Sequence, residues 1–152
     1  MSVSAHWKAT VIAPGGPRQV LRALLDAGWT HGEAPGWRCV PLGDDDEWDW
    51  RLLEGDGAEI VLGLLDKKME AREVFGVELS WAGTNVGITV LLPPQANSAK
   101  ASALSLLVGA DINRMKKGVR VTDSEWYTSR LLPAFDRPGG PRLERWDWVE
   151  SD

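Results

Sequence analysis

Apolar and polar residues alternate with a period of two in several short segments of the chain. Alternation of this kind is typical of strands that bury one face and expose the other. In the first such segment Trp7 and Val11 fall on one side, and Lys8 and Thr10 fall on the other. The strands predicted from this pattern cover residues 5–12, 36–42, 47–53, 58–65, 75–81, 86–92 and about 143–149.

Two pairs of these segments are separated by turn residues and are predicted to form hairpins. The first pair joins 47–53 to 58–65 through a Gly-Asp-Gly turn at 55–57. The second pair joins 75–81 to 86–92 and has the clearest alternation in the chain. Hairpins between consecutive strands predict an antiparallel sheet.

Two other segments have apolar residues at the helical spacing of three or four positions. Residues 17–27 begin with proline and are followed by Gly28. Proline is common at the first position of a helix, and glycine is common just after its last residue. Residues 123–132 follow Thr122, and Glu125 three positions later completes a capping box. The sequence therefore predicts two principal helices.

Two further runs are less distinctive. Residues 66–73 have helical propensity, and their length predicts one or two turns of helix. The apolar run 102–112 fits either a helix or a buried strand, because periodicity does not separate the two for short apolar runs. Both alternatives stay open for 102–112.

These elements predict an α+β fold in which an antiparallel sheet of about five to seven strands carries two principal helices packed on one face. The length of 152 residues fits one globular domain, residues 1–152, because no linker or shift in composition divides the chain. Its hydrophobic fraction of 43% and charged fraction of 26% are those of a globular protein, which argues against disorder.

The sequence carries no signal for a membrane or for export. No run of about 18 apolar residues is present, and the first ten residues lack the basic and apolar regions of a signal peptide. Cys39 is the single cysteine, so no disulfide can form within the chain. We therefore expect a cytoplasmic protein that makes no membrane contact.

Charge is distributed unevenly along the chain. The net charge of −5 argues against a nucleic-acid partner, whose binding proteins usually present a basic surface. Between residues 44 and 59, eight acids stand against Arg51 alone, a local balance of −7. These acids are Asp44, Asp45, Asp46, Glu47, Asp49, Glu54, Asp56 and Glu59. The segment predicts either a solvated loop or a patch that meets a basic partner.

A basic cluster lies farther along the chain, between residues 112 and 122, where no acid occurs. Such a cluster could contact a phosphate or an acidic surface, although cations before a helix also serve solubility. Its members are Arg114, Lys116, Lys117 and Arg120.

The nine tryptophans include two Trp-Asp-Trp motifs, at 48–50 and 146–148. In a strand this residue order places the two indole rings on the buried face and the carboxylate between them on the solvent-exposed face. The alternative is an exposed pair that anchors a partner, since tryptophan is enriched among interface hot spots. We expect Trp48 and Trp50 to lie in the core, and likewise Trp7, Trp81 and Trp126.

Motifs for catalysis, cofactor binding or metal binding are absent from the sequence. His6 and His31 lack metal-ligand spacing, and the acidic run lacks the spacing of a calcium loop. Cys39 lies within an apolar pattern and is expected to be a small buried residue. The sequence therefore predicts no cofactor and no metal.

These observations favour a non-enzymatic protein-binding domain whose acidic patch occludes a basic surface of another protein, in the manner of bacterial immunity proteins or antitoxins. The alternative is a small-molecule-binding protein or enzyme with a pocket between the sheet and the helices. The residues expected to contact the partner are Asp44, Asp45, Asp46, Glu47, Asp49 and Asp56.

Overall fold

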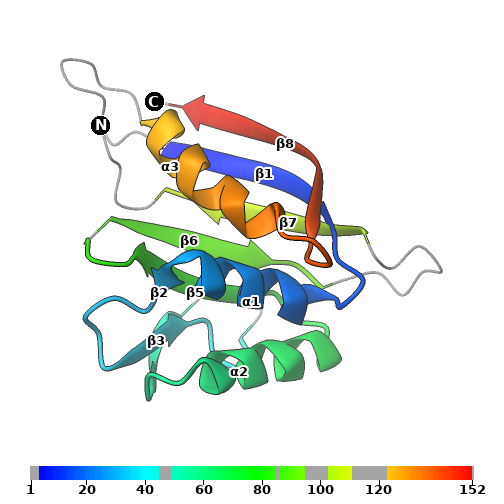
Figure 1. Ribbon diagram of the computed structural model, residues 1–152. Coiled ribbons are helices and arrows are strands. Elements are labelled where there is room, and N and C mark those ends of the chain that lie inside the picture. Colours follow the sequence, from blue (N-terminus) through cyan, green and yellow to red (C-terminus); the bar gives the residue numbers. More distant parts are fainter. Residues whose placement is uncertain (1–3, 45–48, 85, 95–102, 111–122, 152) are drawn as a thin grey trace.

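The computed structural model describes the chain except for residues 1–3, 45–48, 85, 95–102, 111–122 and 152 (Figure 1). The strands are β1 (Ser4–Ile12), β2 (Trp29–Thr30), β3 (Gly36–Cys39), β4 (Arg51–Glu54), β5 (Phe75–Trp81), β6 (Gly87–Leu92), β7 (Ala103–Gly109) and β8 (Arg142–Ser151). The helices are α1 (Pro17–Ala27), α2 (Ala58–Glu70) and α3 (Ser124–Leu131), and a 3₁₀ turn, η1 (Leu132–Phe135), follows α3.

All eight strands belong to one antiparallel sheet. Seven of them follow the order β4-β3-β5-β6-β7-β1-β8, and the short β2 pairs with the end of β5. The two edges of the sheet are therefore β4 and β8. This result confirms the predicted α+β class and antiparallel sheet.

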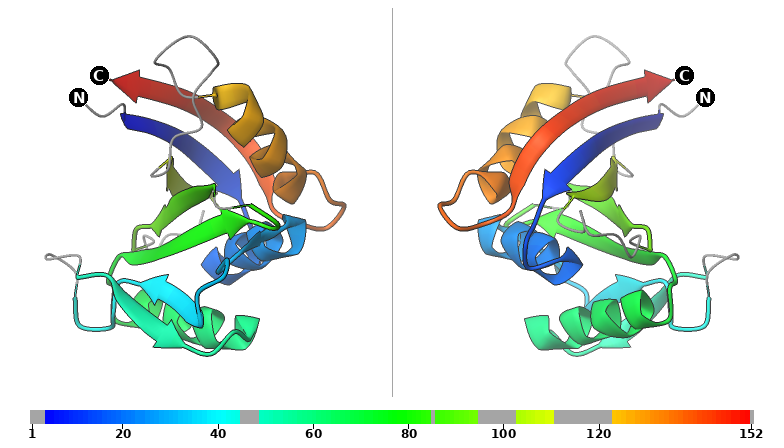
Figure 2. Two further views of the ribbon diagram at one scale, coloured as in Figure 1. Left: turned by 90° about the vertical axis from the view of Figure 1, so that its left-hand side faces the viewer. Right: turned by 90° about the vertical axis from the view of Figure 1, so that its right-hand side faces the viewer.

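In the described part of the chain three helices lie on one face of the sheet, and none of them covers the other face, which we call the open face (Figure 2). Strand residues that point toward the helices form the core together with the buried sides of the helices. Trp7, Val77 and Val90 are among them, and each is fully buried. None of the helices in the described part of the chain is long and apolar enough to cross a membrane.

The open face carries polar residues as well as apolar ones, because alternate strand residues point away from the core. Arg38 on β3 lies opposite Glu78 on β5, and their side chains form an ion pair at 3.4 Å. Trp50 folds over Gly76 on this face, where a β-carbon on the glycine would come within 3.0 Å of the ring. Trp50 is therefore half-buried against the open face and lies outside the core, which corrects the prediction made for it.

Segment 58–65 is not a strand, and the hairpin predicted between it and 47–53 is wrong. These residues form the first part of α2, which continues to Glu70. Its buried positions, Val61, Leu62, Leu65 and Lys68, follow the helical spacing, whereas Ile60 is 37% exposed. Ile60, Leu62 and Leu64 alternate as in a strand, but residues two positions apart lie on opposite sides of a helix, and the buried face of α2 follows Val61, Leu62 and Leu65 instead.

Several other element predictions are confirmed, whereas the strands predicted at 36–42 and 47–53 are the shorter β3 and β4. Residues 17–27 form α1 with the predicted bounds, and residues 75–81 form β5. The ambiguous run at 102–112 contains a strand, β7, which pairs with β6 and β1. In α3 the N-cap is Asp123, whose carboxylate accepts the backbone N–H of Trp126 at 3.2 Å. The capping partner predicted there, Thr122, lies outside the described residues.

The predicted core tryptophans divide into two groups. Trp7 is fully buried, whereas Trp81 and Trp126 are half-buried and pack against the edge of the core. The guanidinium of Arg130 lies 4.1 Å from the ring centre of Trp126 and 5.8 Å from that of Trp81. Trp29 completes this cluster with edge-to-face contacts to both rings. The cluster attaches α3 to the ends of β2 and β5.

Gly36 allows β4 to approach β3 closely. A β-carbon at Gly36 would collide with the carbonyl oxygen of Leu53 and lie 2.9 Å from Cα of Glu54, which is its partner in the ladder. We expect Gly36→Ala to lower the free energy of unfolding by about 1–3 kcal/mol, because a backbone neighbour must move. Urea denaturation measures this loss.

Gly63 is the matched control because a β-carbon there meets no atom within 4 Å. Gly63→Ala lies inside α2 and should leave stability unchanged or raise it by up to about 1 kcal/mol. A Gly36→Ala variant as stable as the wild type would contradict the close approach of the two strands.

Candidate functional site

The described residues of the acidic segment lie on the loop that follows β3, on the edge strand β4 and from there to the start of α2. Three of its predicted contact residues are described: Asp44, Asp49 and Asp56. The others, Asp45, Asp46 and Glu47, lie outside the described residues, as does Trp48. We call Asp44, Asp49, Glu54 and Asp56 the acidic edge.

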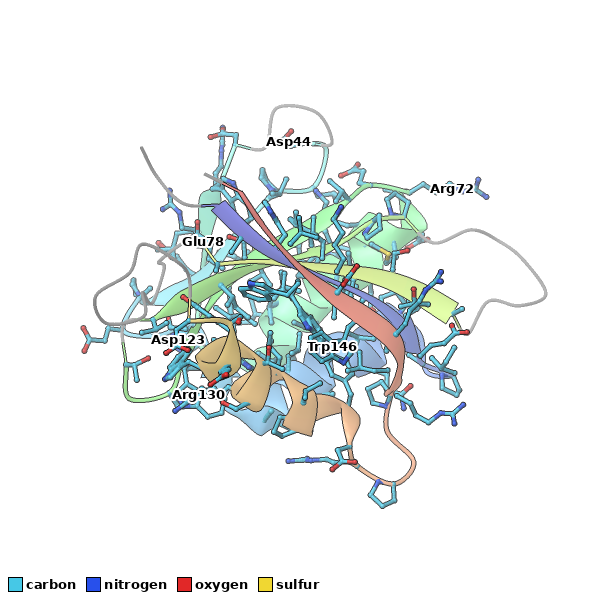
Figure 3. All side chains as sticks on the ribbon, turned by 90° about the horizontal axis from the view of Figure 1, so that it is seen from above. Asp44, Arg72, Glu78, Asp123, Arg130 and Trp146 are labelled. Atoms are coloured by element: carbon cyan, nitrogen blue, oxygen red, sulfur yellow. The ribbon has the colours of Figure 1, made fainter. Side chains whose placement is uncertain are left out.

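A short hydrogen bond closes the loop between β3 and β4. The carboxylate of Asp44 accepts the backbone N–H of Asp49 at 2.6 Å. Asp49 in turn forms an ion pair with Arg51 at 2.8 Å, where β4 begins. In Figure 3, Asp44 lies on this loop, well away from Trp146 on the opposite edge strand. The two ends of the loop are thus held together at the start of the edge strand.

Lys68 of α2 anchors the same loop from the core side. Its ammonium group is fully buried and donates to the carbonyl oxygens of Pro41 and Asp44, both at 2.8 Å. It also lies 3.3 Å from the Val40 carbonyl oxygen and 3.3 Å from Oε1 of Glu73. A buried cation with several oxygen partners fixes the backbone from Val40 to Asp44, which carries the first residue of the acidic edge.

Apolar side chains are exposed beside the carboxylates. Leu42 is 50% exposed on the loop, and Leu52 is 42% exposed on β4. Leu52 lies opposite Arg38 in the ladder and so projects from the open face. Trp50 and Leu52 share a face of the strand pattern, and that shared face is the open one.

The charge of the acidic segment is only partly available to a partner. Glu59 forms ion pairs with Arg18 and Arg22 of α1, both at 2.6 Å, and these contacts, with Arg22 first, lower the pKa of Glu59. Within the described part of the chain, Glu54 and Asp56 form no ion pair and are exposed. Among the described acids of the segment, free negative charge is therefore found at the end of β4 and just beyond it.

The basic cluster predicted as an anion contact lies outside the described residues, so its arrangement stays a prediction. It comprises Arg114, Lys116, Lys117 and Arg120.

The histidines are separated from each other in the described structure. His31 lies in the loop after β2, where Nδ1 is 2.9 Å from the Ala34 carbonyl oxygen and the ring packs edge-on against Trp37. His6 is on β1. Among the residues that the structure describes, no group of three or more His, Cys, Asp or Glu side chains is arranged to hold a metal ion.

Cys39 is buried on β3, and burial raises the pKa of its thiol to about 12. The nearby Lys68 opposes this rise, and Glu78 adds to it. A thiol is nucleophilic as its thiolate, which is scarce at neutral pH in this environment. Cys39 is therefore a packing residue, as the sequence predicted.

We expect Cys39 to resist alkylation by iodoacetamide at pH 8 in the folded protein and to react fully in urea, as mass spectrometry would report. The raised pKa contributes stability that is complete below the ordinary thiol value of 9.0 and is lost as the pH rises toward about 12. Rapid alkylation of the folded protein at pH 8 would contradict this assignment.

A concavity of about 660 Å³ lies on the open face over β7, β1 and β8. Its lining includes Lys8, Ser105, Arg145 and Asp147. The alternative function inferred from the sequence requires a pocket between the sheet and the helices, whereas this concavity lies on the opposite side of the sheet. The helix-facing side carries the apolar core, and a second concavity of about 720 Å³ lies where η1 meets β8, lined by Leu132, Phe135 and Leu143 among others.

In comparisons with known proteins, no family model, no curated protein and no solved structure matches the chain. The function is therefore inferred from the surface of the chain itself.

Proposed function

We propose that the protein is a non-enzymatic binding domain whose acidic edge covers a basic surface of another protein. One observation carries this proposal: the edge strand β4 and the segments that flank it expose leucines together with unpaired carboxylates. Leu42 and Leu52 supply apolar area, and Glu54 and Asp56 supply free negative charge. Protein interfaces commonly combine an apolar centre with a polar rim in this way.

The carboxylates and the leucines would serve different steps of binding. Exposed acids attract a basic partner over distances of about 10 Å at 0.1 M salt and so raise the association rate. Burial of the leucines would then slow dissociation, because apolar contacts at the centre of an interface supply much of the affinity. The expected partner has a basic surface surrounding an apolar depression.

The anchored loop supports a binding role. Lys68 holds the backbone at Pro41 and Asp44, and Gly43 donates its N–H to Glu73 at 2.9 Å. Backbone that is already fixed, as it is at Pro41, Gly43 and Asp44, loses little conformational entropy when a partner binds, so more of the contact energy becomes affinity. Such anchoring suits an inhibitor that acts by covering its target, as immunity proteins do.

The proposal is tested by capture from cell lysate with matched charge variants. The edge variant Glu54→Lys with Asp56→Lys is compared with the control Glu125→Lys with Asp136→Lys, which alters two exposed acids on and beyond α3. Each pair changes the net charge by the same amount. Quantitative mass spectrometry then compares the proteins retained by the wild type and by each variant.

We expect one protein to be retained in stoichiometric amount by the wild type and by the control, and to be depleted at least about tenfold by the edge variant. Equal retention by both variants would overturn the proposal. A metabolite that co-purifies with the wild type in native mass spectrometry, with no protein partner, would instead support a small-molecule-binding function.

A further inference from the structure

The second edge of the sheet, β8, is long and has an unpaired side. It spans ten residues without proline, and among the described strands only β1 pairs with it (Figure 1). Trp146 is 42% exposed and Val149 is 45% exposed on this strand. A long edge strand with exposed apolar side chains is a template for pairing with another strand.

One hydrogen bond determines which backbone groups of β8 point outward. The N–H of Ala110 donates to the Ala5 carbonyl oxygen at 3.0 Å, so odd-numbered residues of β1 bond to β7. Even-numbered residues of β1 consequently bond to β8, where their partners include Arg145 and Asp147. The N–H and C=O groups of Trp146 therefore point away from the sheet, as do those of Trp148.

This geometry restricts how β8 can pair with a second copy of itself. In an antiparallel pair between two copies, the outward N–H and C=O groups of one β8 must face those of the other, so even-numbered residues must lie opposite even-numbered residues. This condition is met only when the two-fold axis passes through a residue, and it fails when the axis passes between two residues. An axis at Arg145 or at Asp147 would place like charges directly opposite each other. An axis at Trp148 would place Asp147 opposite Val149 and would form no pair between Arg145 and Asp147.

An axis at Trp146 gives a favourable pattern. It places Arg145 opposite Asp147 of the second copy, and the symmetry forms this pair twice. Opposite charges that face each other across strands stabilise a sheet, and like charges destabilise it. Lys8, the partner of Asp147 within its own sheet, extends the alternation of positive and negative charge across the junction.

The same register brings the two Trp146 residues together at the axis. Each ring lies on the helix-facing side of its own sheet, 5.9 Å from the ring centre of the fully buried Trp7. Pairing would remove exposed indole surface from water on both copies. An irregularity in the ladder opposite Thr10 and Val11 restricts regular pairing to about residues 144–148, close to the average strand length.

We propose that two copies of this chain form a symmetric dimer by antiparallel pairing of their β8 strands, in the register centred on Trp146. The contact is isologous and closes after two copies. Because β8 and β4 are opposite edges of the sheet, the dimer leaves both acidic edges free. The proposal therefore stands apart from the function proposed above.

Charge exchange across the axis tests both the dimer and its register. Sedimentation velocity over about 1–200 µM protein would give the dissociation constant of the dimer. We expect Arg145→Asp to raise it at least about tenfold, and Asp147→Arg to do the same, because each places like charges opposite one another twice. The double exchange, Arg145→Asp with Asp147→Arg, should restore the wild-type constant to within about threefold.

Thermal unfolding followed by circular dichroism confirms that each variant is folded before its mass is measured. Glu125→Lys is the control for a changed charge away from β8 and should dimerise like the wild type. A wild-type protein that is monomeric at 200 µM would overturn the proposal. Single variants that dimerise normally, or a double exchange that stays monomeric, would overturn the register.

Discussion

Replacing Lys68 with methionine is expected to lower the free energy of unfolding by about 3–5 kcal/mol. Methionine fills a similar volume but cannot donate a hydrogen bond. The carbonyl oxygens of Pro41 and Asp44 would lose their hydrogen-bond donor, and the largely buried carboxylate of Glu73 would lose its counter-charge. Buried acceptors without donors carry the full cost of desolvation. Equilibrium denaturation in urea measures the change.

Lys67 provides the control because it precedes Lys68 on α2 but is exposed. Lys67→Met should change the free energy of unfolding by less than about 0.5 kcal/mol. Nearly equal stability of the two variants would show that the buried ammonium does not hold the loop. A second expected effect of Lys68→Met is weaker partner binding, because the backbone that carries Leu42 and Asp44 would lose its anchor.

Trp7→Ala is expected to lower the free energy of unfolding by about 3–5 kcal/mol, because a fully buried ring would leave a cavity. Trp7 lies at the centre of β1 and contacts the rings of Phe135 and Trp146, at centre distances of 6.0 and 5.9 Å. Removing the Trp7 ring therefore removes packing contacts with both η1, the 3₁₀ turn after α3, and the edge strand β8. Thermal and urea denaturation provide the measurement.

Trp7→Phe removes the indole N–H but keeps an aromatic ring, so it separates the effect of the lost side-chain volume from the effect of the lost polar group. The indole Nε1 of Trp7 is buried and has no hydrogen-bond partner among the described residues, so its removal costs no hydrogen bond. Trp7→Phe should consequently be less destabilising than Trp7→Ala by at least about 1 kcal/mol. Equal losses for the two variants would contradict this explanation.

Elements with a strong local pattern could be predicted from the sequence. The helix at 17–27 has both a proline start and a glycine stop, and β5 alternates over its whole length, so local signals agree with the tertiary structure. The first turns of α2 could not be assigned correctly, because this apolar run fits two periods: Ile60, Leu62 and Leu64 alternate, whereas Val61, Leu62 and Leu65 have helical spacing. The choice between the periods depends on packing against α1 and the sheet, which the sequence does not express.

The candidate site was only partly predictable. The sequence located the acids around β4, but it did not show that Glu59 pairs with α1 while Glu54 and Asp56 stay free. It also did not identify Lys68 as the anchor of the loop. Its only signal is a helical spacing from Leu65 that places it on the buried face, and lysines at such positions usually extend to water.

The acidic edge is tested most directly by the association rate with the captured partner, measured by stopped flow at about 0.01 M and 0.1 M salt. The Debye length falls from about 30 Å to about 10 Å over this range. The wild-type rate should fall at least about tenfold as salt screens Glu54 and Asp56. The Glu54→Lys, Asp56→Lys variant should bind more slowly and with little salt dependence, whereas an unchanged rate and salt dependence in that variant would contradict the account.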